Sequence, residues 1–325
     1  MSPLPADRVQ QHRPFKNCGV DYCGPFWTHY KIRGKRPHKV YLKVFCCFST
    51  KAVHLEVVSD LTTQAFLAAL KRFCGRRGLP AKIYSDNATN FVGAYNELSE
   101  VKEAIFAEEA QALIHKTCAN LSIEFKFIPP RAPHFGGLWE ASVKSAKHLL
   151  KRTLYTATLT HEELETIVID IEAILNSRPL TSVSSSPRDL TALTPGHFLI
   201  GEPLTASPDI HQSRRRTGLL TRWKRIEQLR KEFWTRWSHE YLHELQNRSK
   251  WTRSCKTVKI GDLVIIKEDN IAPLNWPLGR IVAVHPGKDG EIRVAEIRTT
   301  SGNITRAIHR LAVLPINEKK EKTDL

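Results

Sequence analysis

Three acidic residues of the sequence stand in contexts that favour shared chemistry. Asp21 lies within a strand-like apolar segment, Asp86 follows the short strand-like segment 82–85, and Glu140 lies early in a segment with helical spacing. An acid within a strand is disfavoured by propensity, and an acid on a core sheet costs free energy unless it is paired or binds a metal. Asp21, Asp86 and Glu140 are therefore candidates for one site.

Three converging carboxylates would support metal-dependent chemistry, because Mg²⁺ prefers oxygen ligands. Two such ions about 3.5–4 Å apart can activate an attacking hydroxyl and stabilise a leaving oxygen in phosphodiester transfer. Taken singly, each acid has a simpler interpretation. A strand-edge Asp is usually a cap or turn residue, and Glu140 could pair with Lys144 four positions later on a helix. The three contexts together favour the metal site.

The segments around these acids alternate between strand-like and helical patterns. Strands are expected at Cys18–Tyr22, before a Gly24-Pro25 turn, and at 40–48, 52–58, 82–85 and 124–128. Helices are expected from a Thr62 cap to a stop at 75–80, and over about 96–119, 136–154 and 160–175. Strands followed by strand–helix alternation predict an α/β fold, a mixed sheet flanked by helices.

The C-terminal part has a different character. Residues 181–216 read as a Ser/Pro-rich connection, and a long amphipathic helix is expected over about 219–246. Trp223, Ile226, Phe233 and Trp237 recur in that helix at helical spacing. Short strands are expected at 263–267, 279–284, 292–299 and 304–306, and their close spacing predicts a small β-barrel.

These patterns divide the chain into five parts. We expect a flexible lead-in, a catalytic core, a basic Trp-rich helical linker, a small β-barrel that binds DNA, and a disordered tail. Their limits are 1–14, 15–200, 201–258, 259–316 and 317–325.

The charge balance points to a polyanionic partner. Among 325 residues, 49 Lys and Arg stand against 33 Asp and Glu, a net charge of +16, with a pI near 9.6. Residues 214–259 alone hold 14 Lys or Arg against four Glu, a net +10. No apolar stretch reaches the roughly 20 residues needed to cross a bilayer, which disfavours a membrane role.

The seven cysteines are scattered and odd in number, so we expect reduced thiols and no structural zinc.

Ordered motifs around the three acids carry a resemblance. Val20–Pro25, Ser85–Phe91 and His134–Glu140 resemble the acidic motifs of retroviral-type (DDE) integrases. Asn90–Ala94 and Phe135–Glu140 look most like integrases of BEL/Pao-type LTR retrotransposons. The resemblance continues through Asn176–Leu180, Leu193–Phe198 and Ile308–Leu311, and covers roughly residues 12–315.

The resemblance implies a fold and an activity. It implies an RNase H-like core with a mixed five-stranded sheet, then a helical linker and a small SH3-like β-barrel. Asp21, Asp86 and Glu140 would hold Mg²⁺, for which Mn²⁺ can substitute. Water would cleave near the 3′ end of the element's DNA, and the exposed 3′-hydroxyl would attack target DNA. Both steps are in-line displacements that need no protein nucleophile.

The same resemblance implies the partners. The chain would bind double-stranded DNA, both the element ends and the target, and would form a homo-oligomer. It would act in the nucleus when chromosomal DNA is the substrate. Lys144, Lys147 and Lys151 share the face of Glu140, and a solvated helix face is the plainer interpretation. The tryptophans of 214–259 fit helix packing or contacts within an oligomer better than base stacking. We expect DNA contacts from Lys144, Lys147, Lys151, Asn87, Asn90, Arg214, Arg215 and Arg216.

The sequence also departs from the family pattern. Glu140 follows Asp86 by 54 positions, which requires a helical insertion around 97–118, and Ala88 stands where many relatives carry Gly. The zinc module that precedes this core in the family is not expected in the chain. An inactive DNA-binding remnant of a transposable element is therefore the alternative function. RNase H itself is disfavoured, because its acids would not be expected in this order before a basic linker and barrel.

Overall fold

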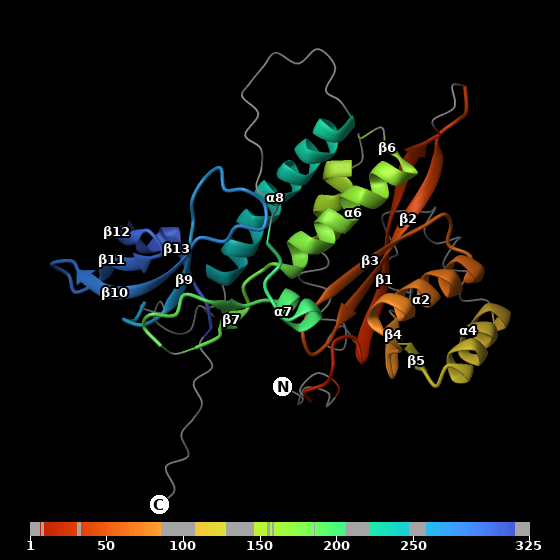
Figure 1. The fold of residues 1–325 in the computed structure, drawn as a ribbon, viewed down its shortest axis with the longest axis horizontal. Helices are drawn as coiled ribbons and strands as arrows, with labels where there is room; N and C mark the ends of the chain where they lie inside the picture. The colour runs from red at the N-terminus through yellow and green to blue at the C-terminus, as the bar shows by residue number, and fades with distance from the viewer. Residues whose placement is uncertain are drawn as a thin grey trace, which may run out of the picture. The chain divides into compact units, whose positions relative to one another are not determined.

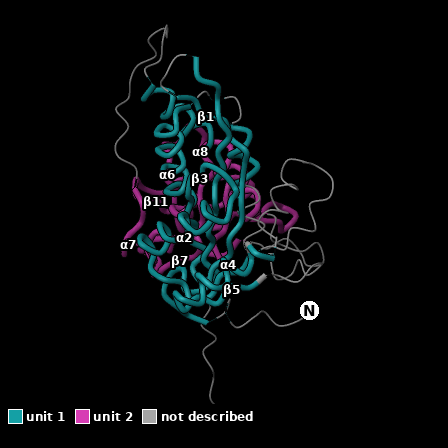
Figure 2. Tube along the Cα trace, turned by 90° about the vertical axis from the view of Figure 1, so that its right-hand side faces the viewer, with its two compact units in different colours: residues 1–175, 217–233 teal, residues 176–216, 234–325 magenta. Residues whose placement is uncertain are grey.

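A computed structural model describes residues 7, 10–30, 34–85, 108–127, 146–154, 157, 159–184, 186–205, 222–246 and 258–315. The chain forms two compact units, shown in Figure 2. Unit 1 comprises residues 1–175 and 217–233, and unit 2 comprises residues 176–216 and 234–325. The five domain limits expected from the sequence stay a prediction.

Unit 1 is built on a mixed sheet (Figure 1). Its first three strands are antiparallel neighbours, and β4 and β5 run parallel to β1 in the order β3-β2-β1-β4-β5. The short β6 pairs with β1 in parallel. This arrangement confirms the predicted α/β core. The strands are β1 (Asn17–His29), β2 (His38–Cys47), β3 (Val53–Val58), β4 (Lys82–Ser85), β5 (Glu124–Phe127) and β6 (Leu159–Thr160).

The turn predicted at Gly24-Pro25 is wrong, because both residues lie inside β1. The register with β2 shifts between Cys23 and Phe26, so the strand passes these two residues as a bulge. Proline has no N–H for the ladder, and a bulge is one of the few places in a sheet that accepts it. β1 therefore continues to His29 and becomes a long central strand.

The helices of unit 1 follow their sequence signals. Thr62 caps α2 by accepting a hydrogen bond from the Ala65 N–H at 3.2 Å, and Gly78 ends the helix with a φ of 80°. The predicted segments 96–107 and 136–145 lie outside the described residues, whereas residues 146–154 are helical. The named helices are α2 (Thr63–Arg77), α4 (Glu108–Asn120) and α6 (His161–Asn176).

The apolar faces of these elements meet in the core of unit 1. Phe73 of α2 stacks on Phe45 of β2 with ring centroids 4.1 Å apart and meets Phe15 edge-to-face at 5.4 Å. All three rings are fully buried, and each such side chain contributes roughly 1.5–3 kcal/mol. The predicted apolar face of α6 is buried as well: Leu164, Ile167, Val168, Ile171 and Leu175.

Unit 2 contains a five-stranded antiparallel sheet in the order β12-β11-β10-β9-β13. This sheet is consistent with the expected SH3-like domain, and β13 is a strand that sequence patterns did not predict. The 3-10 turn η2 (Ile308–Arg310) precedes it. The strands are β9 (Leu263–Ile266), β10 (Leu278–Pro286), β11 (Ile292–Thr299), β12 (Gly302–Ala307) and β13 (Leu311–Val313).

The predicted connection 181–216 is more ordered than expected where it is described. It contains a small hairpin of β7 (Thr181–Ser182) and β8 (Ala192–Leu193), followed by α7 (Pro195–Ile200). Thr194 and His197 form a capping box at the start of α7, with Pro195 in the first turn. These local signals outweigh the loop-like composition of the segment.

Helix α8 (Arg222–Gln246) belongs to both units, which divide between Phe233 and Trp234. Trp234 and Trp237 are buried, whereas Trp223 is 65% exposed and does not pack within the described part of the chain. Helical spacing assigns a face, yet it does not say how far along the helix that face is covered.

One arginine connects three segments of unit 2. The Arg280 side chain, on β10, is buried and donates hydrogen bonds to the carbonyl oxygens of Ser184, Asp189 and Gly261 at 2.8–3.2 Å. Trp276 likewise donates to the Ser177 hydroxyl at 3.1 Å. The sheet of unit 2 is therefore fastened to residues 176–189 by hydrogen bonds.

For the described residues, the structure also reports on the cysteines and on membrane-spanning helices. The six cysteines among them form no disulfide. No helix in this part of the chain is long and apolar enough to cross a membrane.

Candidate active site

Asp21 lies on the central strand of unit 1. β1 pairs with β2 on one side and with β4 on the other, and Asp21 is opposite Val44. Its neighbour Val20 is buried, whereas the Asp21 side chain is 34% exposed. The Tyr22 N–H donates a hydrogen bond to Asp21 Oδ1 at 2.7 Å. The carboxylate is thus held in one orientation and remains accessible.

Lys147 contacts the Asp21 carboxylate directly. Lys147 Nζ forms an ion pair with Asp21 Oδ2, and the Lys147 carbonyl accepts a hydrogen bond from the Cys23 thiol at 3.7 Å. Burial raises the pKa of Cys23 to about 11, so this thiol stays protonated and can donate. The helical residues 146–154 are fixed on β1 by these contacts. Lys147, predicted to bind DNA, is therefore placed beside a predicted metal ligand.

The structure describes only part of the predicted site. Ser85, the last residue of β4, pairs with Val20 in the parallel register, immediately before Asp21. Lys151 is half-buried, one helical turn after Lys147. The other predicted site residues lie outside the described residues: Asp86, Glu140, Asn87, Asn90, Lys144, Arg214, Arg215 and Arg216.

The donor chemistry of Asp21 fits a hard divalent cation. A carboxylate supplies the oxygen ligands that Mg²⁺ prefers. Oδ2 already attracts a cationic group, the Lys147 ammonium, and Oδ1 carries one hydrogen bond. Among the described residues no three His, Cys, Asp or Glu side chains form a metal-binding group. Asp21 is the one member of the predicted triad in that part of the chain.

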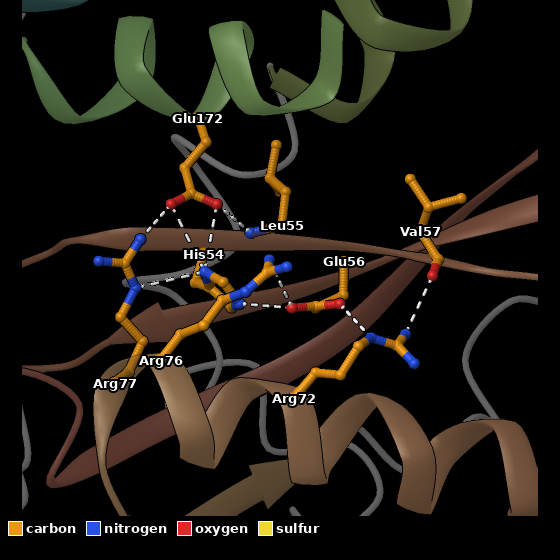
Figure 3. Close-up of polar contacts among 8 residues, drawn as sticks. All are labelled: His54, Leu55, Glu56, Val57, Arg72, Arg76, Arg77 and Glu172. Carbon is orange, nitrogen blue, oxygen red and sulfur yellow. Dashed lines mark hydrogen bonds and ion pairs between the residues drawn. The ribbon is translucent and has the colours of Figure 1, made fainter. Parts of the chain in front are cut away.

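A second charged cluster is buried where β3 lies between α6 and α2 (Figure 3). His54 Nε2 contacts Glu56 Oε1 at 3.0 Å, and His54 Nδ1 contacts Glu172 Oε2 at 3.2 Å. Arg72 and Arg76 of α2 pair with Glu56 at 2.7 and 3.1 Å, and Arg77 pairs with Glu172. We call these six residues the His54 cluster: His54, Glu56, Arg72, Arg76, Arg77 and Glu172.

The His54 cluster also satisfies the outer edge of β3. Glu172 Oε2 accepts a hydrogen bond from the Leu55 N–H at 2.7 Å, and Arg72 donates to the Val57 carbonyl at 3.1 Å. Leu55 and Val57 direct these groups away from β2, so they would otherwise lack partners in the sheet. Because guanidinium and backbone groups already occupy the carboxylate oxygens, we interpret the cluster as structural and not as a metal centre.

Hydrogen bonds within the His54 cluster shift the pKa values of His54 and Glu56. Burial opposes a charge on His54, but hydrogen bonds to Glu172 and Glu56 outweigh it and raise the His54 pKa above its ordinary value. Burial likewise opposes the Glu56 charge, and hydrogen bonds from His54 and Arg72 lower its pKa. Both shifts favour the ion-paired state of the cluster.

A lysine and a tyrosine with unsatisfied polar atoms lie next to Asp21. Lys43 of β2 is opposite Tyr22 of β1, and both are largely buried. The Lys43 Nζ and the Tyr22 hydroxyl have no hydrogen-bond partner among the described residues. The ammonium group lies 2.9 Å from the centroid of the Phe66 ring. Burial lowers the pKa of Lys43 and raises that of Tyr22, so each shift favours the neutral form.

Sequence patterns predicted neither the His54 cluster nor the buried Lys43. The alternation of polar His54 and Glu56 with apolar Leu55 in β3 was a usable signal, because a strand with one charged face needs partners. The four-residue spacing from Arg72 to Arg76 on α2 was the matching signal. Lys43 gave no such signal, since a single lysine in a strand usually extends to solvent.

A family model and several solved structures match parts or most of the chain. A family of unknown function, DUF5641, matches residues 221–314. No curated protein matches the sequence.

Among solved structures, the chain aligns with a simian T-cell lymphotropic virus intasome in complex with PP2A regulatory subunit B56 gamma. The identity is 14%, the alignment covers 97% of this chain and 84% of that chain, and the TM-score is 0.38. The HTLV-2 integrase catalytic core domain, in complex with magnesium in a trimeric form, aligns at 19% identity over 58% of this chain and 99% of that chain, with a TM-score of 0.35. Its dimeric form aligns at 20% identity over 53% and 93%, with a TM-score of 0.33.

Proposed function

We propose that this protein is an integrase that cleaves near the 3′ end of an element's DNA and joins that end to target DNA in a metal-dependent reaction. The observation that supports it most is the position of Asp21, an accessible carboxylate on the central strand beside the end of β4. The motif resemblance supplies the reaction type, and the lineage we propose is that of BEL/Pao-type retrotransposons.

The register of β1 and β4 supports Asp86 as the partner of Asp21. Val20 pairs with Ser85, and Asp21 and Asp86 are the next residues of the two chains. The Cα atoms of Asp86 and Ser85 are joined through one peptide, about 3.8 Å apart. A chain that leaves β4 in the direction of the strand would carry Asp86 to the level of Asp21.

The contact of Lys147 supports Glu140 as the third acid. Glu140 precedes Lys147 by seven residues, and residues seven apart lie on the same face of an α-helix. If the helix of residues 146–154 begins near Gly136, as its sequence predicts, the face that carries Lys147 to Asp21 also carries Glu140. On such a helix Lys144 would lie between them on that face.

The residues proposed to hold Mg²⁺ are Asp21, Asp86 and Glu140. When bound, two such ions would activate the attacking oxygen and stabilise the leaving oxygen of an in-line displacement. The chain itself would position the DNA strand. No residue of the chain would have to act as a nucleophile.

Further parts of the proposal concern partners and location. We propose double-stranded DNA as substrate and target, held largely by residues 214–316, and a homo-oligomer that brings two DNA ends together. The +10 charge of residues 214–259 suits phosphate binding without sequence reading. A nuclear site of action follows if chromosomal DNA is the target.

The proposal is tested by strand transfer with a labelled element-end duplex and Mg²⁺ or Mn²⁺. Asp21→Asn should abolish joining while leaving duplex binding intact, since the change keeps the shape of the side chain and removes its charge. Asp269→Asn makes the same chemical change at an exposed position and should stay active. DNA binding without joining by the wild-type chain under either metal would instead identify an inactive DNA-binding remnant.

A further inference from the structure

A cavity of about 230 Å³ opens in unit 1 at the far end of β1, away from Asp21. It lies where β1 pairs with β6, with His29 opposite Thr160 in the register. Figure 1 shows β6 beside this end of the β1–β2 ribbon, directly before α6. The lining includes His29, Tyr30, Thr160, Glu163, Arg222 and Arg225. Segments distant in sequence therefore meet at one polar pocket.

The charges around this pocket are mostly positive. Arg222 forms an ion pair with Glu163 at 3.4 Å, and this acid also accepts a hydrogen bond from the Thr160 N–H at 2.8 Å. Arg225 has no acidic partner among the described residues. Lys35 adds a further cation, with its Nζ 5.2 Å from the centroid of the Tyr30 ring. In the lining itself, one carboxylate thus stands against two guanidinium groups, and it already caps the first turn of α6.

The size and lining of the pocket select a small anion. Pockets for drug-sized ligands are about 300–1,000 Å³, so this cavity suits a smaller group. Guanidinium groups bind phosphate oxygens with pairs of parallel hydrogen bonds, which makes two arginines on one wall a phosphate-binding arrangement. The Tyr30 and His29 side chains supply further polar atoms on the opposite wall.

The surroundings favour a phosphate that belongs to a nucleic-acid strand over a free ion. Tyr30 is 49% exposed and stacks on His38 with ring centroids 4.6 Å apart, which forms a firm aromatic wall. Exposed aromatic rings beside basic groups are the arrangement on which bases or sugars stack while phosphates are held. A free phosphate ion would use the arginines and leave the aromatic surface without a role.

We propose that this pocket binds a backbone phosphate of a nucleic-acid strand, with Arg222 and Arg225 as its donors. The inference deepens the proposed function by adding a contact point for DNA on unit 1 outside the metal site. It depends on nucleic acid as the partner and not on catalysis, so the two can fail separately.

The experiment measures binding of the full chain to a fluorescein-labelled duplex by anisotropy, over a series of chloride concentrations, with EDTA present to exclude catalysis. Arg225→Gln is compared with Lys224→Gln, which removes the same charge from an exposed neighbour that does not line the pocket. Thermal unfolding checks that both variants fold. Arg225→Lys restores the charge without the guanidinium fork.

We expect Arg225→Gln to weaken binding roughly tenfold, as loss of a charged hydrogen bond would. The slope of log affinity against log salt should fall by about one unit, since one phosphate contact is lost. Arg225→Lys should keep the slope and lose part of the affinity. Lys224→Gln should change both quantities much less. Equal effects of Arg225→Gln and Lys224→Gln would overturn the site, because charge alone would then explain them.

A second arm separates a strand phosphate from a free ion. Inorganic phosphate is substituted for chloride at constant ionic strength. We expect wild-type binding to the duplex to change little, because many contacts hold the strand. Displacement of the duplex by millimolar phosphate, absent in Arg225→Gln, would identify a free-anion site and overturn the nucleic-acid assignment. If Asp21→Asn shows no loss of joining while Arg225→Gln behaves as expected, the proposed function fails and this site stands.

Discussion

Lys147 and Asp21 form an ion pair although 126 positions separate them in the chain. The pair joins the helix predicted to carry Glu140 to the strand that carries Asp21. It also puts a cationic side chain on a carboxylate proposed to bind a metal. A divalent ion at Asp21 and the Lys147 ammonium would compete for the same oxygen.

The first prediction follows from this competition. Lys147→Gln should bind Mn²⁺ roughly two- to fivefold more tightly than the wild type, since a partly exposed ion pair is worth up to about 1 kcal/mol. Electron paramagnetic resonance of free Mn²⁺ during titration measures the affinity. Lys151→Gln, one helical turn away, is the control and should bind Mn²⁺ like the wild type. Weaker Mn²⁺ binding by Lys147→Gln would show that Lys147 supports the metal site and does not compete with it.

The second prediction concerns pH and His54. The pKa of His54 is raised above its ordinary value of 6.5 in the folded state, against burial, by hydrogen bonds to Glu172 and Glu56. The folded protein therefore holds this proton more tightly than the unfolded chain. The resulting stabilisation is full below about pH 6.5 and is lost as the pH rises through the raised pKa.

Urea unfolding at a series of pH values measures this effect. The difference in unfolding free energy between the wild type and His54→Gln should shrink as the pH rises above about 6.5. Comparing the two proteins cancels the titration of all other groups. His148→Gln, at an exposed position, should follow the wild type at every pH. A difference that stays constant with pH would show that the pKa of His54 does not change on folding, and one that grows as the pH rises would show that His54 is neutral in the fold.

The third prediction is that Lys43 destabilises the fold. Its amine is fully buried without a hydrogen-bond partner among the described residues, and its polar contacts there are with the faces of the Phe66, Tyr22 and Phe45 rings. Burial lowers the pKa of Lys43, and an amine without a hydrogen-bond acceptor in the core, charged or neutral, loses more hydration free energy than aromatic faces restore. Lys43→Met, which keeps the length of the side chain, should raise the unfolding free energy by about 1–3 kcal/mol. Calorimetry should show a higher Tm, and Lys71→Met on the exposed face of α2 should not. A lower Tm for Lys43→Met would show that the amine of Lys43 stabilises the fold.

The fourth prediction concerns Arg280. Arg280→Met should destabilise unit 2 by about 3 kcal/mol, because three backbone carbonyls lose a charged donor in a buried setting. Hydrogen exchange should become faster in residues 184–189 as well as in β10. Arg298→Met, on the neighbouring strand at an exposed position, is the matched control. Unchanged exchange in 184–189 would show that this segment is held by other contacts.

Local signals predicted much of the fold correctly. Helix α2 was predicted at both ends because Thr62 and Gly78 act through residues a few positions away. The first three strands were predicted because each buries β-branched and aromatic side chains. The bulge at Gly24-Pro25 was missed, since the same dipeptide more often makes a turn. Partner strands decide between these outcomes, and they are not visible in a local window.

The candidate site was predictable in a different way. Asp21 was found because an acid in an apolar strand conflicts with its surroundings. Its contact with Lys147 was not predicted, because the seven-residue spacing from Glu140 suggested a DNA contact and said nothing about β1. The His54 cluster was missed altogether, since Glu172 reaches β3 from 117 positions away. Its members pair through tertiary packing alone.

Glu172 and Arg72 also decide how the sheet can meet another protein chain. An uncovered edge strand offers its N–H and C=O groups as a template for strand addition, which leads to aggregation or domain swapping. At β3 the Leu55 N–H and the Val57 carbonyl already have partners from α6 and α2. A foreign strand would have to displace two charged side chains before it could form a ladder there. In the folded chain, the ion pairs of this cluster thus oppose strand addition at this edge.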